Sequence, residues 1–203
     1  MPYFVKVIDT KTNTALGGAK VVAVSAGDKY SLALTSDGRV FAWGDNSHGQ
    51  LGLHKVGGMV TAPTKLALAN VNGVSAGVDH SLFTMYDGSL YAAGSNAYGK
   101  MGQNSEYLPV DTDMGIPTFV PGTSTVVKAS AGQDHSVVLH YNRDAAACGS
   151  NEDGRLGQEL ADNATWTADL KVMDQMSYIM DVDAGRDHSL ALDYNGLLWS
   201  WGN

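Results

Sequence analysis

Four stretches of the chain alternate between apolar and polar or small residues with the two-residue period of a β-strand. They are Ser25–Leu34, Ser75–Thr84, Ser130–Leu139 and Asp183–Leu192. Each stretch is rich in Leu, Val and Ala, which is typical of a strand that lies in the core. The pattern therefore predicts a buried strand in each of these four places.

A turn signal and a second apolar run follow each stretch. The turn signals are Asp37-Gly38, Asp87-Gly88, Asn142-Arg143 and Asn195-Gly196. Asp-Gly and Asn-Gly favour the positive φ angles of a tight hairpin turn. We expect the second strands at Val40–Trp43, Leu90–Ala93, Ala145–Cys148 and Leu197–Trp201.

These elements belong to one repeated unit. The leading glycines Gly27, Gly77, Gly132 and Gly185 are 50, 55 and 53 residues apart. A second glycine follows each of them in the same register, at Gly44, Gly94, Gly149 and Gly202. The first three copies continue as Gly49-Gln50-Leu51-Gly52, Gly99-Lys100-Met101-Gly102 and Gly154-Arg155-Leu156-Gly157. Self-similarity at such a period indicates a repeat architecture.

The connectors between the copies carry the variation in length. They contain Pro63, Pro109, Pro117 and Pro121, and proline is tolerated on edge strands but not in central ones. We expect outer strands near Lys65–Leu68, Thr118–Val120 and Leu170–Val172. Four short strands per copy are typical of a propeller blade, so the sequence predicts an all-β propeller.

The repeat resembles the regulator of chromosome condensation repeat, which reads roughly Ser-Ala-Gly-x-x-His-Ser-Leu-Ala-Leu, Asp-Gly, Trp-Gly, Asn and Gly-Gln-Leu-Gly. Residues 25–52 match that pattern almost throughout, and the resemblance extends over about residues 21–203. It implies a β-propeller, which members of the family usually close from a chain about twice as long. A shared fold does not by itself imply a shared function.

We interpret residues 1–203 as one propeller domain of about four blade-equivalents. Repeats occupy residues 21–70, 71–125 and 126–178, with a half repeat at 179–203 and a closing segment at 1–20. The alternating stretch Tyr3–Ile8 predicts a strand that could complete the last half repeat. The chain is then a short ring, a piece of a longer protein, or an arc completed by another copy. Exposed strand edges and apolar end faces favour assembly.

Composition and charge exclude several classes of protein. There is one cysteine, no zinc-finger spacing and no apolar run long enough for a membrane helix. A net charge of −8 argues against direct binding to nucleic acid phosphates. No basic segment precedes a long apolar one at the N-terminus, so we expect no secretory signal and favour an intracellular protein.

The repeated Asp-His pairs are the first candidate for chemistry. His80, His135 and His188 occupy one repeat position, each after an aspartate. They could bind a metal or act as acid–base groups. One copy per blade favours a structural role instead, with each imidazole bonded to backbone carbonyls that tie neighbouring strands together. Cys148 aligns with Trp43 and Ala93 at a packing position, which predicts a buried, inert thiol.

No catalytic constellation emerges, so we expect no enzyme activity, cofactor or metal. The Gly-x-Leu-Gly segments lack the Lys-Ser/Thr ending of a phosphate-binding loop. The remaining candidates are surface loops. The resemblance to the guanine-nucleotide exchange member of the family implies a partner surface in the loop after each leading glycine, namely Asp28, Lys29, Val78, Asp79, Gln133, Asp134, Arg186 and Asp187. The same residues could simply cap turns.

Three functions are compatible with this reading. The first is a non-catalytic protein-interaction or scaffold module, whose protein partner could be a second copy of the chain. The second is a structural component of a particle or surface, joined through the blade ends. The third is an exchange or regulatory factor for a small GTPase, against which the short chain argues.

Overall fold

The computed structural model describes residues 7, 16–103 and 109–203, and its regular elements are almost all antiparallel strands. The first sheet contains β1 (Val21–Ala26), β2 (Tyr30–Thr35), β3 (Val40–Asp45) and β4 (Met59–Lys65). The second contains β5 (Val71–Ala76), β6 (His80–Met85), β7 (Leu90–Ser95) and β8 (Asp113–Phe119). The third contains β9 (Val126–Ala131), β10 (His135–His140), β11 (Ala145–Ser150) and β12 (Trp166–Val172). The last contains β13 (Ile179–Ala184), β14 (His188–Asp193) and β15 (Leu198–Gly202).

Short 3-10 turns complete the described structure. They are η1 (Leu16–Gly18), η2 (Ala97–Gly99), η3 (Glu152–Gly154) and η4 (Ala161–Asn163). No helix in these ranges is long and apolar enough to span a membrane. The prediction of an all-β propeller with about four blades is confirmed.

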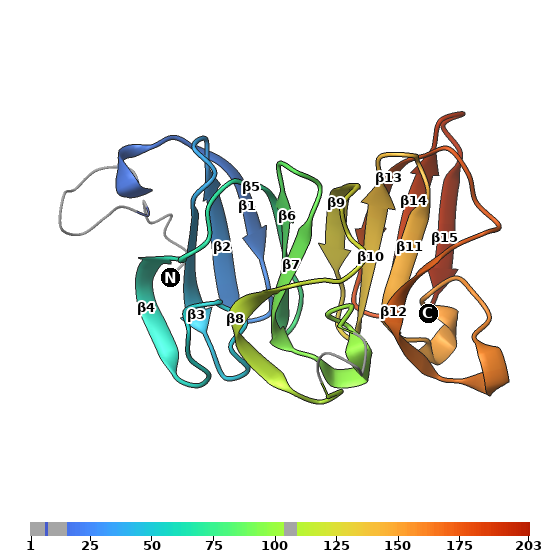
Figure 1. Ribbon diagram of the computed structural model, residues 1–203, viewed down its shortest axis with the longest axis horizontal. Helices are drawn as coiled ribbons and strands as arrows, with labels where there is room; N and C mark the ends of the chain where they lie inside the picture. Colours follow the sequence, from blue (N-terminus) through green and yellow to red (C-terminus); the bar gives the residue numbers. More distant parts are fainter. Residues whose placement is uncertain (1–6, 8–15, 104–108) are drawn as a thin grey trace, which may run out of the picture.

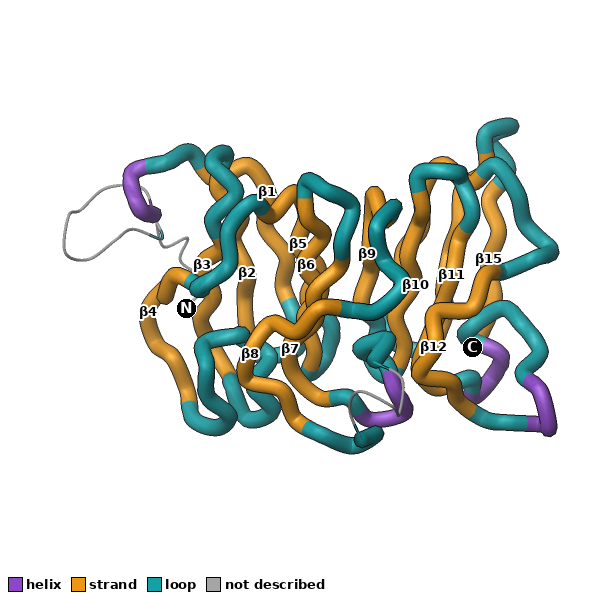
Figure 2. Tube along the Cα trace, in the orientation of Figure 1, coloured by secondary structure: helices purple, strands orange, loops and turns teal. Residues whose placement is uncertain are grey.

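The four sheets stand side by side in chain order (Figure 1). The first sheet lies at one end of the row and the last sheet at the other, with the second and third sheets between them (Figure 2). Each pair of neighbours shares an apolar cluster. One joins Leu32 and Val40 to Phe83, and another joins Leu139 and Ala145 to Val182. The hydrophobic core is therefore located at the junctions between blades.

The hairpins between the second and third strands of each blade form where the sequence predicts them. Gly38, Gly88 and Gly196 have φ angles of 76°, 81° and 81° at these turns. Arg143 stands at the same position in the third blade and has a φ of 75°. A residue with a Cβ pays a steric cost in this region, so the third hairpin is held by its surroundings despite the missing glycine.

Three expectations about strands need correction or lie outside the description. Each predicted first strand is in fact two strands, because the chain turns after the leading glycine; Gly27 N donates to Tyr30 O over 2.9 Å. The outer strands begin earlier than predicted and include Pro63 in β4 and Pro117 in β8, both on sheet edges. The expected strand Tyr3–Ile8 lies outside the described residues except for Val7, which lines a cavity on the first sheet.

Candidate functional site

The leading glycines lie where neighbouring blades approach most closely. A Cβ added to Gly77 would lie 2.5 Å from the carbonyl oxygen of Gly132, and one added to Gly132 would lie 2.7 Å from that of Gly185. Any larger residue would force the loops of adjacent blades apart. The repeated glycine therefore allows the loops after β1, β5, β9 and β13 to lie against one another.

The repeated histidines join each blade to the next. His80 Nε2 lies 2.9 Å from Ser136 Oγ, and His135 Nε2 lies 2.9 Å from Ser189 Oγ. Each serine hydroxyl donates onward to a carbonyl, Ser136 to Lys100 O over 2.7 Å. Because the hydroxyl proton is used there, the imidazole Nε2 must donate to the serine. In the first blade Tyr30 takes this place, and its hydroxyl donates to His80 O over 2.6 Å.

This geometry corrects the expected partner of the imidazoles. Backbone carbonyls were the predicted partners, whereas Nε2 of His80 and of His135 contacts a serine hydroxyl; the Tyr30 hydroxyl reaches a carbonyl directly. Burial lowers the pKa of His80, and burial followed by the charge of Arg155 lowers the pKa of His135 to about 4. Both side chains are therefore neutral near pH 7. His188 occupies the same position on β14, where the described chain has no further blade beside it.

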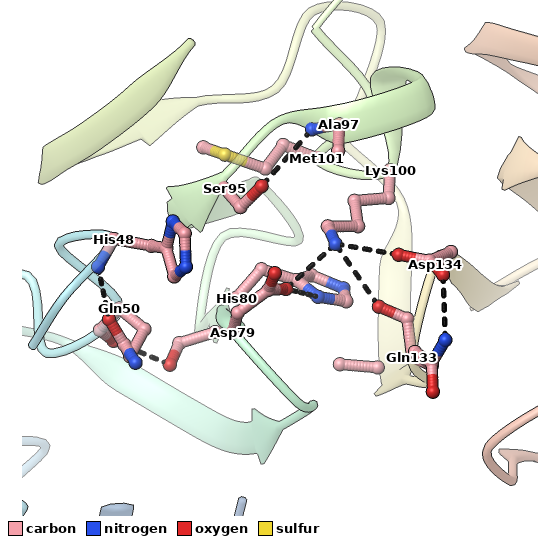
Figure 3. A network of polar contacts seen from close by, with 12 residues as sticks. His48, Gln50, Asp79, His80, Ser95, Ala97, Lys100, Met101, Gln133 and Asp134 are labelled. Atoms are coloured by element: carbon pink, nitrogen blue, oxygen red, sulfur yellow. Dashed lines mark hydrogen bonds and ion pairs between the residues drawn. The ribbon is translucent and has the colours of Figure 1, made fainter. Parts of the chain in front are cut away.

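A buried cation that was not predicted from the sequence connects the second and third blades. Lys100 is 1% exposed, and its Nζ lies 2.7 Å from Asp79 Oδ1, 3.0 Å from Asp134 Oδ1 and 3.2 Å from Gln133 O (Figure 3). Burial by itself would raise the pKa of Asp79, but the contacts with His80 and Lys100 lower it to about 2. The site therefore holds two ionised carboxylates around one ammonium group.

A buried cation also lies at the next junction, where it pairs with only one leading-loop aspartate, that of the following blade. Arg155 is 3% exposed, and its Nη1 lies 3.0 Å from Asp187 Oδ1. Lys100 and Arg155 are both the second residue of a Gly-x-Leu-Gly-type segment. Gln50 has this place in the first blade, where its Nε2 donates to Asp45 within the same blade over 3.2 Å. One feature of the sequence could have indicated these buried contacts: Gln50, Lys100 and Arg155, all long side chains with hydrogen-bond donors, occupy the same repeat position.

The predicted partner surface divides into two groups. The side chains of Asp79, Asp134 and Asp187 are about one fifth to one third exposed, and each forms an ion pair with buried Lys100 or Arg155. The side chains of Asp28, Lys29 and Arg186 are 53%, 72% and 75% exposed. Val78 and Gln133 are half-buried, and Arg186 Nε donates to Gln133 Oε1 over 2.6 Å. We name Asp28, Lys29, Val78, Gln133 and Arg186 the leading-loop rim.

The other candidate reactive groups lie in the core or form no cluster. Cys148 is 1% exposed, and burial raises the pKa of its thiol to about 12. Its Sγ contacts Lys100 O at 3.5 Å. Among residues 7, 16–103 and 109–203, no group of three or more His, Cys, Asp or Glu side chains is placed to hold a metal ion. What the arrangement offers is a rigid surface with distinct side chains on each blade.

Comparisons with known proteins agree with this architecture. A model of the regulator of chromosome condensation (RCC1) repeat matches residues 21–50, 71–100, 126–155 and 179–203, and a second model of the same repeat matches 37–84 and 87–139. The X-linked retinitis pigmentosa GTPase regulator of Canis lupus familiaris is 41% identical over 91% of this chain and 18% of its own length. The Homo sapiens regulator of chromosome condensation is 40% identical over 68% of this chain and 21% of its own length.

Solved structures show the same fold. Yeast RCC1 (Prp20), in a crystal structure with Kap60, has a TM-score of 0.78 and 25% identity over 99% of this chain and 45% of its own. Human WBSCR16 has a TM-score of 0.79 and 24% identity over 97% of this chain and 53% of its own. The chain thus spans about half of these structures and about a fifth of the two sequence relatives. The repeat matches, together with the blades they coincide with, show that this chain belongs to the regulator of chromosome condensation (RCC1) repeat family.

Proposed function

We propose that this chain is a non-catalytic protein-interaction module that binds its protein partner through the leading-loop rim. The observation that carries the proposal is a contrast within one loop. The residue directly after each leading glycine differs from blade to blade, as Asp28, Val78, Gln133 and Arg186, while the residues around it repeat and are held in the junctions. A surface in which the supporting residues repeat while the exposed side chains differ from blade to blade is suited to binding a partner that has no internal symmetry.

Rigidity of the rim supports a binding role. The loops are tied to one another by Val78 N donating to Gly132 O over 3.3 Å and Gln133 N donating to Arg186 O over 3.1 Å. Below them Lys100 holds the aspartates of two blades. A surface that is ordered before binding loses less conformational entropy when it binds.

The rim is also electrostatically uneven. Asp28 and Lys29 form an exposed ion pair at 3.6 Å on the first blade, whereas Arg186 projects from the last blade. The whole chain carries a net charge of −8, so Arg186 is a local positive group on an acidic protein. Such a distribution orients a partner that has acidic groups near Arg186 and uncharged surface over Val78.

Site-specific photo-crosslinking tests the proposal. A photoreactive amino acid replaces Arg186 on the rim or, as a matched control, Arg143 in a hairpin at the opposite ends of the strands. We expect a discrete crosslinked protein from position 186 and none from position 143. Equal crosslinking from the two positions, or crosslinking from position 143 alone, would contradict the proposal that the partner binds the leading-loop rim.

Regulation of a small GTPase is the second candidate function. It is favoured by the relatives, one of which is named a GTPase regulator, and by the solved yeast relative whose structure was described together with its binding to Gsp1p and histones. The test is the rate of nucleotide release from a panel of purified small GTPases with and without this chain. An acceleration that is lost in Arg186→Glu supports this function, and unchanged rates across the panel remove it.

A further inference from the structure

A pocket lies between the second and third blades at the hairpin ends of the strands, opposite the leading-loop rim. Its volume is about 350 Å³, and its walls are the β6–β7 hairpin on one side and residues 124–127 with Tyr141 on the other. Val126 N donates to Gly88 O over 2.9 Å, and Tyr141 N donates to Thr125 O over 2.6 Å. Both walls belong to inner sheets and are held by hydrogen bonds, so the pocket is part of the rigid blade stack.

Two exposed tyrosines line this pocket. Tyr86 and Tyr141 follow β6 and β10 at the same repeat position, and they are 66% and 78% exposed. The first blade has Ser36 at this position and still forms its hairpin, so the fold does not require an aromatic residue there. The negative face of a tyrosine ring attracts a cation, most often the guanidinium of arginine.

Asp87 adds a carboxylate to the same pocket. Its Oδ1 accepts hydrogen bonds from Ser89 N over 2.9 Å and from Ser89 Oγ over 2.6 Å. These bonds lower the pKa of Asp87, so the carboxylate is ionised near pH 7. Among the described residues, no Lys, Arg or His lines the pocket or forms an ion pair with Asp87. The pocket therefore combines a negative charge with aromatic rings.

The first blade shows how a carboxylate at this turn position holds a guanidinium. Asp37 is the equivalent of Asp87, and Arg39 Nε donates to Asp37 Oδ2 over 2.7 Å. The Arg39 Cζ also lies 6.0 Å from the centre of the Phe41 ring. Ser89 replaces this arginine in the second blade. The described part of the second blade thus supplies the carboxylate and the aromatic rings but no guanidinium.

We propose that this pocket binds an arginine side chain of a protein partner, with the guanidinium bonded to Asp87 and stacked on the tyrosine rings. Arginine suits the pocket better than lysine, because a planar guanidinium can donate two parallel N–H groups to a carboxylate and also stack on an aromatic face. The site goes beyond the leading-loop rim, which lies at the other ends of the strands. Arg143, the control position for the rim, is the equivalent of Gly88 and lies at the junction with the last blade, outside this pocket.

An NMR titration of the isotope-labelled chain with short peptides tests the site. The probe is acetyl-Gly-Arg-Gly-amide, and the matched control peptide carries citrulline, which has the shape of arginine without its charge. We expect the arginine peptide at millimolar concentrations to shift the amide signals of Asp87, Gly88 and Val127 saturably, and the citrulline peptide to leave them in place. Equal shifts from the two peptides, or no shift at these amides, would overturn the proposal.

A charge variant tests the contact with the carboxylate. Asp87→Asn should raise the Kd of the arginine peptide by about tenfold, because it removes the charge from the acceptor. The hairpin should survive, since Asn142 and Asn195 occupy this turn position in the last two blades. A folded Asp87→Asn variant with an unchanged Kd would place the arginine elsewhere.

A pair of double variants tests the aromatic contact. Replacing Tyr86 and Tyr141 together by serine should raise Kd by about threefold, because the rings no longer face the cation. The control replaces Tyr178 and Tyr194 by serine; these residues are 71% and 73% exposed but do not line the pocket. The control should bind like the wild type, and an equal rise of Kd in both double variants would contradict the stacking of arginine on the pocket tyrosines.

Discussion

Replacing His135 with glutamine should remove one acid-sensitive step from the stability of this protein. The imidazole is buried between the third and fourth blades and is neutral in the folded state, where its pKa is about 4. In the unfolded chain a histidine has a pKa of about 6.5. Between these two values the unfolded chain binds a proton that the folded chain does not bind, so the free energy of unfolding falls as the pH falls.

The magnitude follows from the two pKa values. From pH 7 to pH 5 the difference in proton binding at His135 should lower the free energy of unfolding by about 2 kcal/mol. Glutamine retains a side-chain donor for Ser189 but does not titrate. The variant is expected to be less stable than the wild type at pH 7, because the packing changes, and to lose about 2 kcal/mol less than the wild type between pH 7 and pH 5.

Urea denaturation at the two pH values measures both quantities. The comparison is a double difference, so His80, His140 and the carboxylates, which titrate in both proteins, cancel to first order. A wild type and a variant that lose the same free energy between pH 7 and pH 5 would refute the assignment of His135 as a buried neutral donor.

Three further perturbations test the junctions. Lys100→Met leaves the carboxylates around it without their cation, and because Asp134 is partly exposed we expect a loss of about 2–3 kcal/mol at pH 7 in chemical denaturation. Gly132→Ala places a methyl group 2.7 Å from Gly185 O and should cost about 1–3 kcal/mol, seen as a lower Tm; an unchanged Tm would mean that the loops separate freely. Cys148 should resist a thiol reagent at pH 8 and react fully in denaturant, because its pKa is about 12; rapid reaction in the folded state would place the thiol outside the core.

Repetition and turn chemistry made much of the fold predictable. The Asp-Gly and Asn-Gly signals correctly predict the hairpins after β2, β6 and β14, because glycine is favoured where φ is positive. The split between β1 and β2 was missed because the apolar alternation of Ser25–Leu34 continues through the turn at Gly27. The outer strands begin earlier than predicted and include Pro63 and Pro117, because an edge strand leaves the proline nitrogen facing away from the ladder.

The contacts between blades were less accessible from sequence. The serine that receives each imidazole lies 56 or 54 residues away, in the next blade, so local spacing does not reveal the pair. Lys100 and Arg155 each lie in a glycine-rich segment that reads as a turn, where a charged side chain is expected to be exposed to solvent. Only the stacking of blades shows that these two cations are buried against aspartates of the leading loops.

The affinity of the crosslinked partner for matched charge-reversal variants tests the proposed binding surface most directly. Arg186→Glu changes the leading-loop rim, and Arg143→Glu makes the same chemical change at the opposite ends of the strands. If the rim binds the partner, Arg186→Glu should raise Kd by about tenfold or more, which corresponds to about 1.4 kcal/mol, and Arg143→Glu should leave Kd unchanged. The reverse order of effects, or no effect of Arg186→Glu, would show that the partner binds elsewhere on the blades.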